Sequence, residues 1–183
     1  MVKRRSRDLA LIDALDALER HPFNGDVWRI TREGRDPLLG SPVAARWDLG
    51  NVDVLYTSLE QDGALAEIGF HLLRQPVFPT KLASLIHRIR VKTTRTLKIG
   101  DARELEALGI LPDEYKSLNY GRCQEIGDAA AFLGFDGLLV PSARWPCLNL
   151  VLYTDQLDPA DTTVLSSEAV DWIAWKANRQ ARS

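Results

Sequence analysis

The sequence predicts an α+β fold in which helices pack on a largely antiparallel sheet. Its apolar segments follow the order helix, strand, long loop, strand, helix, strands, two helices, strands, helix, which is not a regular β-α-β alternation. Such an order favours helices packed on antiparallel sheet. Residues 86–99 alternate with period two, which is typical of a strand with one solvated face. The length of 183 residues favours one domain with a full-sized core.

The N-terminal part is predicted to contribute one helix and two strands. Within residues 4–20, helical spacing is shown by Leu9, Ile12, Leu15 and Leu18. The stretch HPFNGD at 21–26 is expected to end that helix, VWRIT at 27–31 to form a short strand, and VDVLYTS at 52–58 to form the next strand. Residues 32–51 between the strands form a long irregular connection, and such loops are usually functional or disordered.

The middle of the chain is predicted to hold a helix that carries Glu67 and then an extended segment. Ser58 and Gln61 form a capping box for the helix. In the segment 86–99, one parity is apolar and the other basic: Ile89, Val91, Leu97 and Ile99 against Arg88, Arg90, Lys92 and Lys98. This alternation predicts one strand, or two, with a solvated basic face.

The remaining elements are short. Two helices are predicted to stop at glycines, DARELEALG at 101–109 and GRCQEIGDAAAFLG at 121–134. GLLV and NLVLYT are predicted strands, with PSARWPC between them. The last segment, SSEAVDWIAWKANRQARS, is predicted to be a helix with Ser167 as its N-cap and a frayed basic end.

Composition argues against several classes of function. The formal net charge is −2 and the isoelectric point about 5.9, whereas dedicated nucleic-acid binders usually have a basic patch and a high isoelectric point. The basic start is the local exception and is expected to be a solvated terminus, with contact to an acidic partner as the alternative: Lys3, Arg4, Arg5 and Arg7. No apolar run reaches the ~18 residues of a membrane span, and no secretory signal is visible.

The cysteines and histidines suggest neither disulfides nor a metal site. The two cysteines, Cys123 and Cys147, lie far apart and lack a nearby histidine, as in a reduced cytoplasmic protein. The three histidines form no metal-binding motif and no evident catalytic triad. Neither a G-x-G-x-x-G fingerprint after a strand nor a P-loop is present. We therefore expect a soluble cytoplasmic protein without a metal and without direct contact to nucleic acid.

Arginine stands beside tryptophan at three places, in Trp28-Arg29, Arg46-Trp47 and Arg144-Trp145. Guanidinium groups bind phosphates bidentately and stack on aromatic rings. Arg29 lies in an apolar strand, where a charge costs free energy unless it has a partner. That partner is either a pyrophosphate or an internal carboxylate, and the residues alone favour the carboxylate.

Three more residues are candidates because of their positions. Tyr56 and Ser142 lie at the ends of predicted strands, where a scaffold often presents site residues to a ligand. Glu67 lies on a helix among small and apolar neighbours, and carboxylates are rarely buried without a partner. Taken singly, each has an ordinary explanation: Tyr56 as a packing residue, Ser142 as a turn hydroxyl and Glu67 as a solvated helix residue.

Four segments in this order resemble the RES domain family of bacterial toxins from toxin–antitoxin operons: VWRIT, ARWDLGNVDVLYTS, GALAEIGFHLL and GLLVPSARWP. The family pattern runs Y-R, G-G-R-W-N, V-x-Y-T, A-L-A-x-E and V-P-S. The resemblance carries over to Arg29, Arg46, Tyr56, Glu67 and Ser142. Two departures are visible: AARWD replaces G-G-R-W-N, and in the tail pattern N-x-x-x-N Asn149 is present but Tyr153 replaces the second asparagine.

The resemblance implies an ADP-ribosyltransferase-like fold and a reaction in which NAD+ loses nicotinamide. Glu67 would stabilise the oxocarbenium character of the ribose in the transition state. Arg29 and Arg46 would bind the pyrophosphate, and Tyr56 would stack on the nicotinamide ring. Ser142 would hydrogen-bond the ribose or the carboxamide. The acceptor of ADP-ribose is left open between water, phosphate and a side chain of a host protein.

The resemblance also implies domain limits and a partner. One RES-type domain would span 1–183, with a helical extension at 1–25, the core at 26–157 and a C-terminal helix at 158–183. A cognate antitoxin with a helix-turn-helix domain would bind the chain and cover the active site. The alternative is a catalytically inactive RES-fold protein that only binds the antitoxin, and the two alanines of AARWD keep that alternative open.

Overall fold

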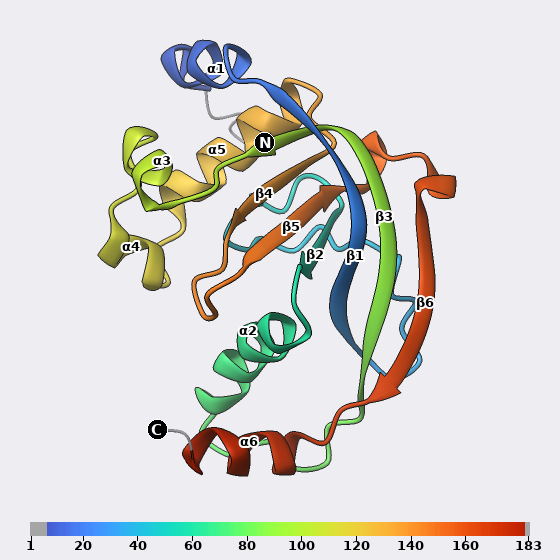
Figure 1. The fold of residues 1–183 in the computed structure, drawn as a ribbon. Helices are drawn as coiled ribbons and strands as arrows, with labels where there is room; N and C mark the ends of the chain where they lie inside the picture. The colour runs from blue at the N-terminus through green and yellow to red at the C-terminus, as the bar shows by residue number, and fades with distance from the viewer. Residues whose placement is uncertain (1–6, 182–183) are drawn as a thin grey trace, which may run out of the picture.

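The computed structural model describes residues 7–181, which form a six-stranded sheet with helices around it (Figure 1). The strands are β1 (Arg20–Arg32), β2 (Val54–Ser58), β3 (Ser84–Lys98), β4 (Gly137–Pro141), β5 (Leu148–Tyr153) and β6 (Thr162–Ala169). The helices are α1 (Leu9–Asp16), α2 (Gln61–Leu73), α3 (Ala102–Ala107), α4 (Pro112–Lys116), α5 (Gly121–Phe132) and α6 (Trp172–Ala181), with 3-10 turns η1 (Thr154–Gln156) and η2 (Pro159–Asp161).

The strand order is β1-β2-β5-β4-β3-β6, and β1 also pairs with β3. This extra pairing joins five strands into a closed circuit and leaves β6 on the outer side of β3. Every pairing between the described strands is antiparallel except β3 with β4, which is parallel. The predicted α+β fold with a largely antiparallel sheet is therefore confirmed.

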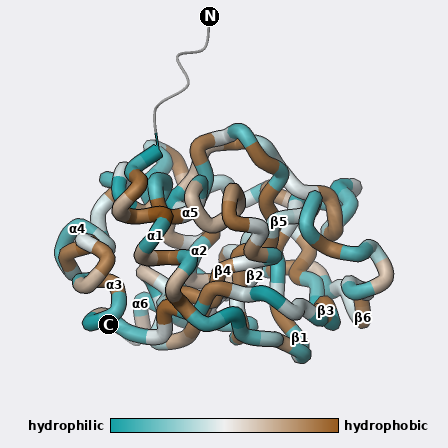
Figure 2. Tube along the Cα trace, turned by 90° about the horizontal axis from the view of Figure 1, so that it is seen from above, coloured by the Kyte–Doolittle hydropathy of each residue, from teal (hydrophilic) through white to brown (hydrophobic). Residues whose placement is uncertain are grey.

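The helices gather at two ends of the sheet (Figure 1). Helix α5 lies over β4 and contacts α1, whereas α2 packs against β1 and β2 at the opposite end, near α6. The hydropathy colouring of Figure 2 places the largely hydrophobic β4 and β5 in the middle of the molecule. Within residues 7–181, no helix combines the length and the apolar character needed to cross a bilayer.

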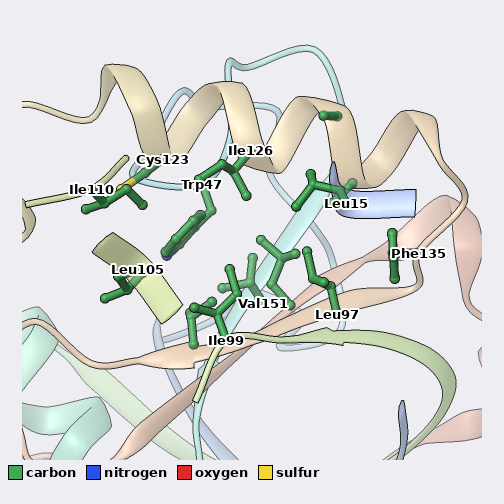
Figure 3. Packing of buried hydrophobic residues seen from close by; sticks show 14 of the residues in the cluster. Leu15, Trp47, Leu97, Ile99, Leu105, Ile110, Cys123, Ile126, Phe135 and Val151 are labelled. Carbon is green, nitrogen blue, oxygen red and sulfur yellow. The ribbon is translucent and has the colours of Figure 1, made fainter. Parts of the chain in front are cut away.

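The larger hydrophobic core lies between α5 and the sheet, and Figure 3 shows its side chains from close by. Its residues come from distant parts of the chain, including Leu15 of α1, Leu97 of β3, Ile126 of α5 and Val151 of β5. A smaller cluster forms on the other face of the sheet around Val27, Leu55, Ile89, Val91, Leu150 and Leu152. The alternation of Val151 with Leu150 and Leu152 between two faces is the period-two signature of a strand buried on both sides.

The predicted long irregular connection is confirmed for the segment between β1 and β2, and it is anchored in the core. Trp47 is only 2% exposed and Asp48 only 1%. The carbonyl oxygen of Trp47 lies so close to α5 that a Cβ at Gly127 would be 2.0 Å from it. A helix residue larger than glycine at this position would push the loop away, so Gly127 sets the position of the segment that follows Arg46.

Several predicted elements are present. The period-two segment is one strand, β3, and GLLV and NLVLYT lie within β4 and β5. Helices α3 and α5 end just before Gly109 and Gly134, whose φ angles of 84° and 75° lie in the left-handed region that favours glycine.

The strand predicted at 27–31 is present, but it is not short, because β1 begins at Arg20 and covers the whole HPFNGD stretch that was expected to end the first helix. This stretch pairs with β3, and the register shifts between His21 and Phe23. Pro22 lies at that shift, where a residue without an N–H is tolerated. Pro22, Asn24 and Gly25 favour a turn locally, but hydrogen bonding of this stretch to the long strand β3 keeps it extended.

The predicted C-terminal helix is present only as Trp172–Ala181, and its predicted start at Ser167 is wrong. Residues up to Ala169 form β6, in which Ser167 pairs with His87 of β3. The helix begins only at Trp172, and the Asp171 carboxylate accepts a hydrogen bond from Ala174 N at 2.9 Å. Asp171, rather than Ser167, therefore caps the helix. The last two residues lie outside the described range.

The predicted capping box at Ser58 and Gln61 is not formed. Ser58 is the last residue of β2, and the N-cap of α2 is Glu60, which makes no side-chain capping bond. The Ser58 hydroxyl instead accepts a long hydrogen bond from Glu60 N at 3.4 Å and contacts Cys147 Sγ at 3.3 Å. The serine thus connects the start of α2 to the loop that precedes β5.

The basic start is only partly within the described residues, since Lys3, Arg4 and Arg5 precede them. Arg7 is not a free solvated end. It donates from Nε to Asp128 on α5 at 2.6 Å, and its guanidinium carbon lies 4.4 Å from the centre of the Phe132 ring. An ion pair at a surface contributes roughly 0–1 kcal/mol, so this contact positions the segment before α1 more than it stabilises the fold.

Candidate active site

A cavity of about 420 Å³ opens between β1, β2, α2 and the long loop before β2. This volume is in the range of small-molecule sites, roughly 300–1,000 Å³. Four of the five predicted site residues line it, namely Arg29, Arg46, Tyr56 and Glu67. Aromatic side chains form much of the remaining wall: Trp28, Trp47, Tyr115 and Tyr120. The structure therefore brings together residues that lie up to 38 positions apart, from Arg29 to Glu67.

Glu67 is half-buried, and two side chains hold its carboxylate. Ser142 Oγ donates to Glu67 Oε1 at 2.6 Å, and Asn149 Nδ2 donates to the same oxygen at 3.0 Å. Oε2 accepts no hydrogen bond from residues 7–181, and none of the ion pairs among those residues includes Glu67. The carboxylate is thus oriented through one oxygen while the other keeps its full capacity as an acceptor.

Small residues on α2 bring this carboxylate close to the sheet. The buried positions of the helix are Gly63, Ala64, Ala66, Gly69 and Leu72. At Gly63 a Cβ would lie 2.2 Å from Ser58 Oγ and 2.6 Å from Cys147 Sγ, so the helix begins in direct contact with β2 and with the loop that precedes β5. This close packing allows a side chain as short as Glu67 to reach Asn149 on β5.

Ser142 does not line the cavity. Its hydroxyl accepts hydrogen bonds from the backbone N–H groups of Arg144 and Trp145, at 3.1 and 3.2 Å, and gives its own proton to Glu67. The backbone of the loop after β4 therefore fixes the hydroxyl, and the hydroxyl fixes the carboxylate. This geometry supports a role for Ser142 in positioning the carboxylate of Glu67.

Arg29 lies on β1, and both terminal nitrogens of its guanidinium are bound to backbone. Nη1 donates to the Tyr56 carbonyl at 3.1 Å and Nη2 to the Leu39 carbonyl at 3.3 Å, while Nε is buried without a partner among the described residues. Burial, and then the charge of Arg35, lowers the pKa of Arg29 to about 10, so the group stays protonated at neutral pH. The internal carboxylate favoured by the residues alone is wrong for the described chain, since none of its ion pairs contains Arg29.

Arg46 projects from the long loop and is held by α4 and by the segment that follows it. It donates from Nη1 to the Tyr115 carbonyl and from Nη2 to the Ser117 carbonyl at 3.4 Å. Its guanidinium carbon lies 4.8 Å from the ring centre of Tyr115 and 4.6 Å from that of Tyr120. The two rings and two carbonyls fix the plane of the guanidinium, which a flexible ammonium group would not match.

Tyr56 of β2 contributes its ring to the cavity wall and its hydroxyl to the loop. The hydroxyl oxygen accepts from Trp47 N at 2.9 Å. Burial raises the pKa of the Tyr56 phenol well above its usual value, which keeps it neutral. Among the residues that the structure describes, none accepts the phenolic proton, so the hydroxyl remains able to donate to a ligand.

A family model described as "RES domain" matches residues 26–173. The chain belongs to the RES domain family. A probable NAD+ phosphorylase of Mycobacterium tuberculosis, Rv3189, is 28% identical over 155 residues, which are 81% of this chain and 74% of that protein. The NAD+ phosphorylase MbcT of Mycobacterium bovis is 24% identical over 167 residues, 87% of this chain and 90% of that protein.

The fold of this RES domain is also similar to a crystal structure of the M. tuberculosis MbcT–MbcA toxin–antitoxin complex. The TM-score is 0.82 at 23% sequence identity, with 93% of this chain and 97% of that chain covered. At this identity the similarity establishes the fold, and it agrees with the α+β architecture predicted from the sequence.

Asn149 and Arg144 also line this RES domain cavity and were not among the five predicted site residues. Asn149 matched one position of the family tail, and its Oδ1 is buried without a partner in the described chain while its Nδ2 holds Glu67. Arg144 belongs to the arginine–tryptophan pair Arg144-Trp145 in the sequence, and it also lines the cavity. Neither the orphaned oxygen of Asn149 nor the direction of Arg144 follows from spacing along the chain, because both depend on strand pairing and loop conformation.

The AARWD segment, which replaces G-G-R-W-N of the family pattern, forms part of the cavity wall and a tight turn. Ala44 and Ala45 lie on the cavity wall, and Ala45 exchanges backbone hydrogen bonds with Asp48. Asp48 Oδ1 accepts from Gly50 N at 2.7 Å, but Oδ2 is buried without a partner in the described residues. Burial raises the pKa of this carboxyl. The turn is therefore closed with alanines in place of the family's glycines.

Proposed function

We propose that this chain is the toxin of a toxin–antitoxin system and that it cleaves the nicotinamide–ribose bond of NAD+, with inorganic phosphate as the acceptor of ADP-ribose. The observation that carries the proposal is a carboxylate, Glu67, oriented by two donors on the wall of a cavity that also presents arginine side chains. The names of the relatives as NAD+ phosphorylases support phosphate over water or a protein side chain.

The reaction needs little acid–base chemistry at the leaving group. Nicotinamide is cationic while attached to ribose and leaves as a neutral molecule, so no general acid is required. The ribose becomes positive as the bond breaks, in the manner of glycoside hydrolysis. A fixed negative charge near that carbon lowers the barrier, because the interaction grows as the charge develops. Glu67 would supply this charge.

The other wall residues suit the remaining parts of NAD+. Arg29 and Arg46 would bind the pyrophosphate through their remaining N–H groups. The ring of Tyr56 would stack on nicotinamide, and the unpartnered Oδ1 of Asn149 would accept a hydrogen bond from the carboxamide or a ribose hydroxyl. Ser142 would contribute by holding Glu67 or by exchanging its proton with a bound ribose hydroxyl.

We further propose that a cognate antitoxin with a helix-turn-helix domain covers the cavity, since an uninhibited enzyme that consumes NAD+ would harm its own cell. The crystallised relative is itself a complex with an antitoxin, MbcA. The alternative remains an inactive RES-fold protein that only binds its antitoxin. The alanines and Asp48 of AARWD are the specific observation behind this alternative.

Expression in bacteria separates the two functions. Induced without antitoxin, the wild-type chain should stop growth and deplete cellular NAD+, and coexpression of the product of the neighbouring gene in its operon should restore both. A matched culture that expresses an equal amount of the Glu67→Gln variant should keep growing. If the soluble wild-type chain leaves growth and NAD+ unchanged, the enzyme proposal fails and the binding protein is favoured.

A further inference from the structure

Two guanidinium groups are anchored next to each other where α4 ends. Arg46 donates to the carbonyls of Tyr115 and Ser117, and Arg144 donates from Nη1 to the carbonyl of Lys116 at 2.8 Å. These three carbonyls are consecutive in the chain, and both arginines line the cavity. The structure thus holds two cations side by side on one wall.

Neither guanidinium group of this pair forms an ion pair within the part of the chain that the structure describes. None of the ion pairs within residues 7–181 contains Arg46 or Arg144. Two neighbouring positive charges in a partly buried setting repel each other. The pKa of Arg144 is lowered first by burial and next by the charge of Arg46, whereas Glu67 opposes that shift. An anion bound between the guanidinium groups would convert the repulsion into two attractions.

Of these arginines, Arg144 has a terminal guanidinium nitrogen that makes no hydrogen bond within the described residues. Arg29 and Arg46 each use both terminal nitrogens on backbone carbonyls, but Nη2 of Arg144 is buried without a hydrogen-bond partner in the described residues. A buried guanidinium nitrogen without an acceptor is costly, which indicates that a ligand supplies one.

The guanidinium group of Arg144 lies against the helix that carries Glu67. The guanidinium carbon of Arg144 is 3.4 Å from the centre of the Phe70 ring. Phe70 follows Glu67 by three positions on α2, and residues so spaced share a helix face with Cβ atoms about 5–6 Å apart. Arg144 is therefore held within one helical turn of Glu67 and yet makes no ion pair with it.

We propose that Arg144 binds the inorganic phosphate that accepts ADP-ribose and so selects phosphate over water, while Arg46 lies between this phosphate and the pyrophosphate of NAD+ and faces both. This inference rests on the proposed function. A phosphate dianion near Glu67 would be repelled unless cations compensate, and the two guanidinium groups do so with bidentate geometry. The pyrophosphate of NAD+ is several bonds away from the reacting carbon, whereas the acceptor must approach that carbon, where Glu67 acts.

The transfer balances without a further reactant. An oxygen of hydrogen phosphate forms a bond to the anomeric carbon of the nicotinamide ribose while the carbon–nitrogen bond breaks. The electron pair of the broken bond leaves with nicotinamide, which becomes neutral. Hydrogen phosphate needs no base for this attack, but water would have to lose a proton. A site that binds the dianion therefore favours phosphorolysis over hydrolysis.

Steady-state kinetics with purified Arg144→Met tests the inference, with NAD+ and inorganic phosphate varied separately. The KM for phosphate should rise about 10–100-fold, as expected for the loss of hydrogen bonds to a charged group, while the KM for NAD+ changes less than about threefold. The share of free ADP-ribose among the products should increase. Arg122→Met is the matched control, because Arg122 also donates to a backbone carbonyl, that of Leu108 at 2.8 Å, but lies outside the cavity.

Arg144→Lys provides a second variant in case the methionine variant does not fold, and it should show a smaller rise in the KM for phosphate. An unchanged phosphate KM in a folded variant, or a rise confined to the KM for NAD+, would overturn the inference. Nicotinamide release by the wild-type protein, measured with and without phosphate, tests the proposed function and the acceptor site separately. No nicotinamide release at all contradicts the proposed function, whereas release at a rate independent of phosphate contradicts only the acceptor site.

Discussion

Replacing Glu67 with Gln should lower turnover about 10²–10³-fold, or roughly 2.7–4 kcal/mol of barrier, by analogy with the loss of one preorganised electrostatic group. The variant keeps the size of the side chain and an Oε1 that can still accept from Ser142 and Asn149. It removes the negative charge and replaces Oε2, which has no hydrogen-bond partner among the described residues, by an NH2 group, which donates hydrogen bonds. NAD+ binding should change little, because the positive charge on the ribose develops only on the way to the transition state.

The melting temperature of Glu67→Gln should change little or rise. A half-buried carboxylate that lacks a paired cation costs folding free energy, so removing its charge relieves part of that cost. Measuring kcat and the melting temperature together decides between the two tasks of this residue. Glu106→Gln, at an exposed position of α3, controls for the substitution itself. A destabilised variant with near-normal turnover per folded molecule would contradict the catalytic role and show that Glu67 serves only the stability of the fold.

Replacing Arg46 with Lys should reduce kcat/KM for NAD+ about tenfold to a hundredfold, within the range for hydrogen bonds to charged groups. The positive charge is kept, but one ammonium group cannot span the carbonyls of Tyr115 and Ser117 and lie flat against Tyr115 and Tyr120 at the same time. The loss should therefore come from geometry, with the net charge of the cavity unchanged.

Circular dichroism checks that Arg46→Lys folds, and initial rates over a range of NAD+ concentrations give the kinetic constants. Arg103→Lys, at an exposed position of α3, is the control for an arginine-to-lysine change far from the cavity. Wild-type constants in a folded Arg46→Lys protein would remove Arg46 from the substrate site. A larger effect on the KM for phosphate than on that for NAD+ would instead assign Arg46 mainly to the acceptor.

The sequence was sufficient for those features that depend on local pattern. Period-two alternation predicted β3, and glycines predicted the ends of α3 and α5. The ordered motif of the RES family predicted five residues, of which four line one cavity and the fifth, Ser142, holds Glu67 from behind. In these cases the information lies in neighbours along the chain or in the order of segments that characterises the family.

The features that the sequence did not predict depend on partners distant in the chain. Pro22 and Gly25 carry a turn signal, yet they lie in β1 because β3 pairs with the whole stretch. Ser167 looks like an N-cap until β3 supplies a strand partner. The unused Nη2 of Arg144 can be recognised only once Lys116 and Phe70 are in place around it. Tertiary pairing and side-chain direction decided each of these cases.

The most direct test of the account is the fate of isotopically labelled phosphate. Purified wild-type protein is incubated with NAD+ and inorganic phosphate that carries ¹⁸O at every oxygen, and the masses of the products are determined by mass spectrometry. We expect nicotinamide together with ADP-ribose phosphorylated at the anomeric carbon, with all of the labelled oxygens retained, because a phosphate oxygen attacks carbon. Free ADP-ribose with an oxygen from water and no phosphorylated product, or intact NAD+, would contradict it.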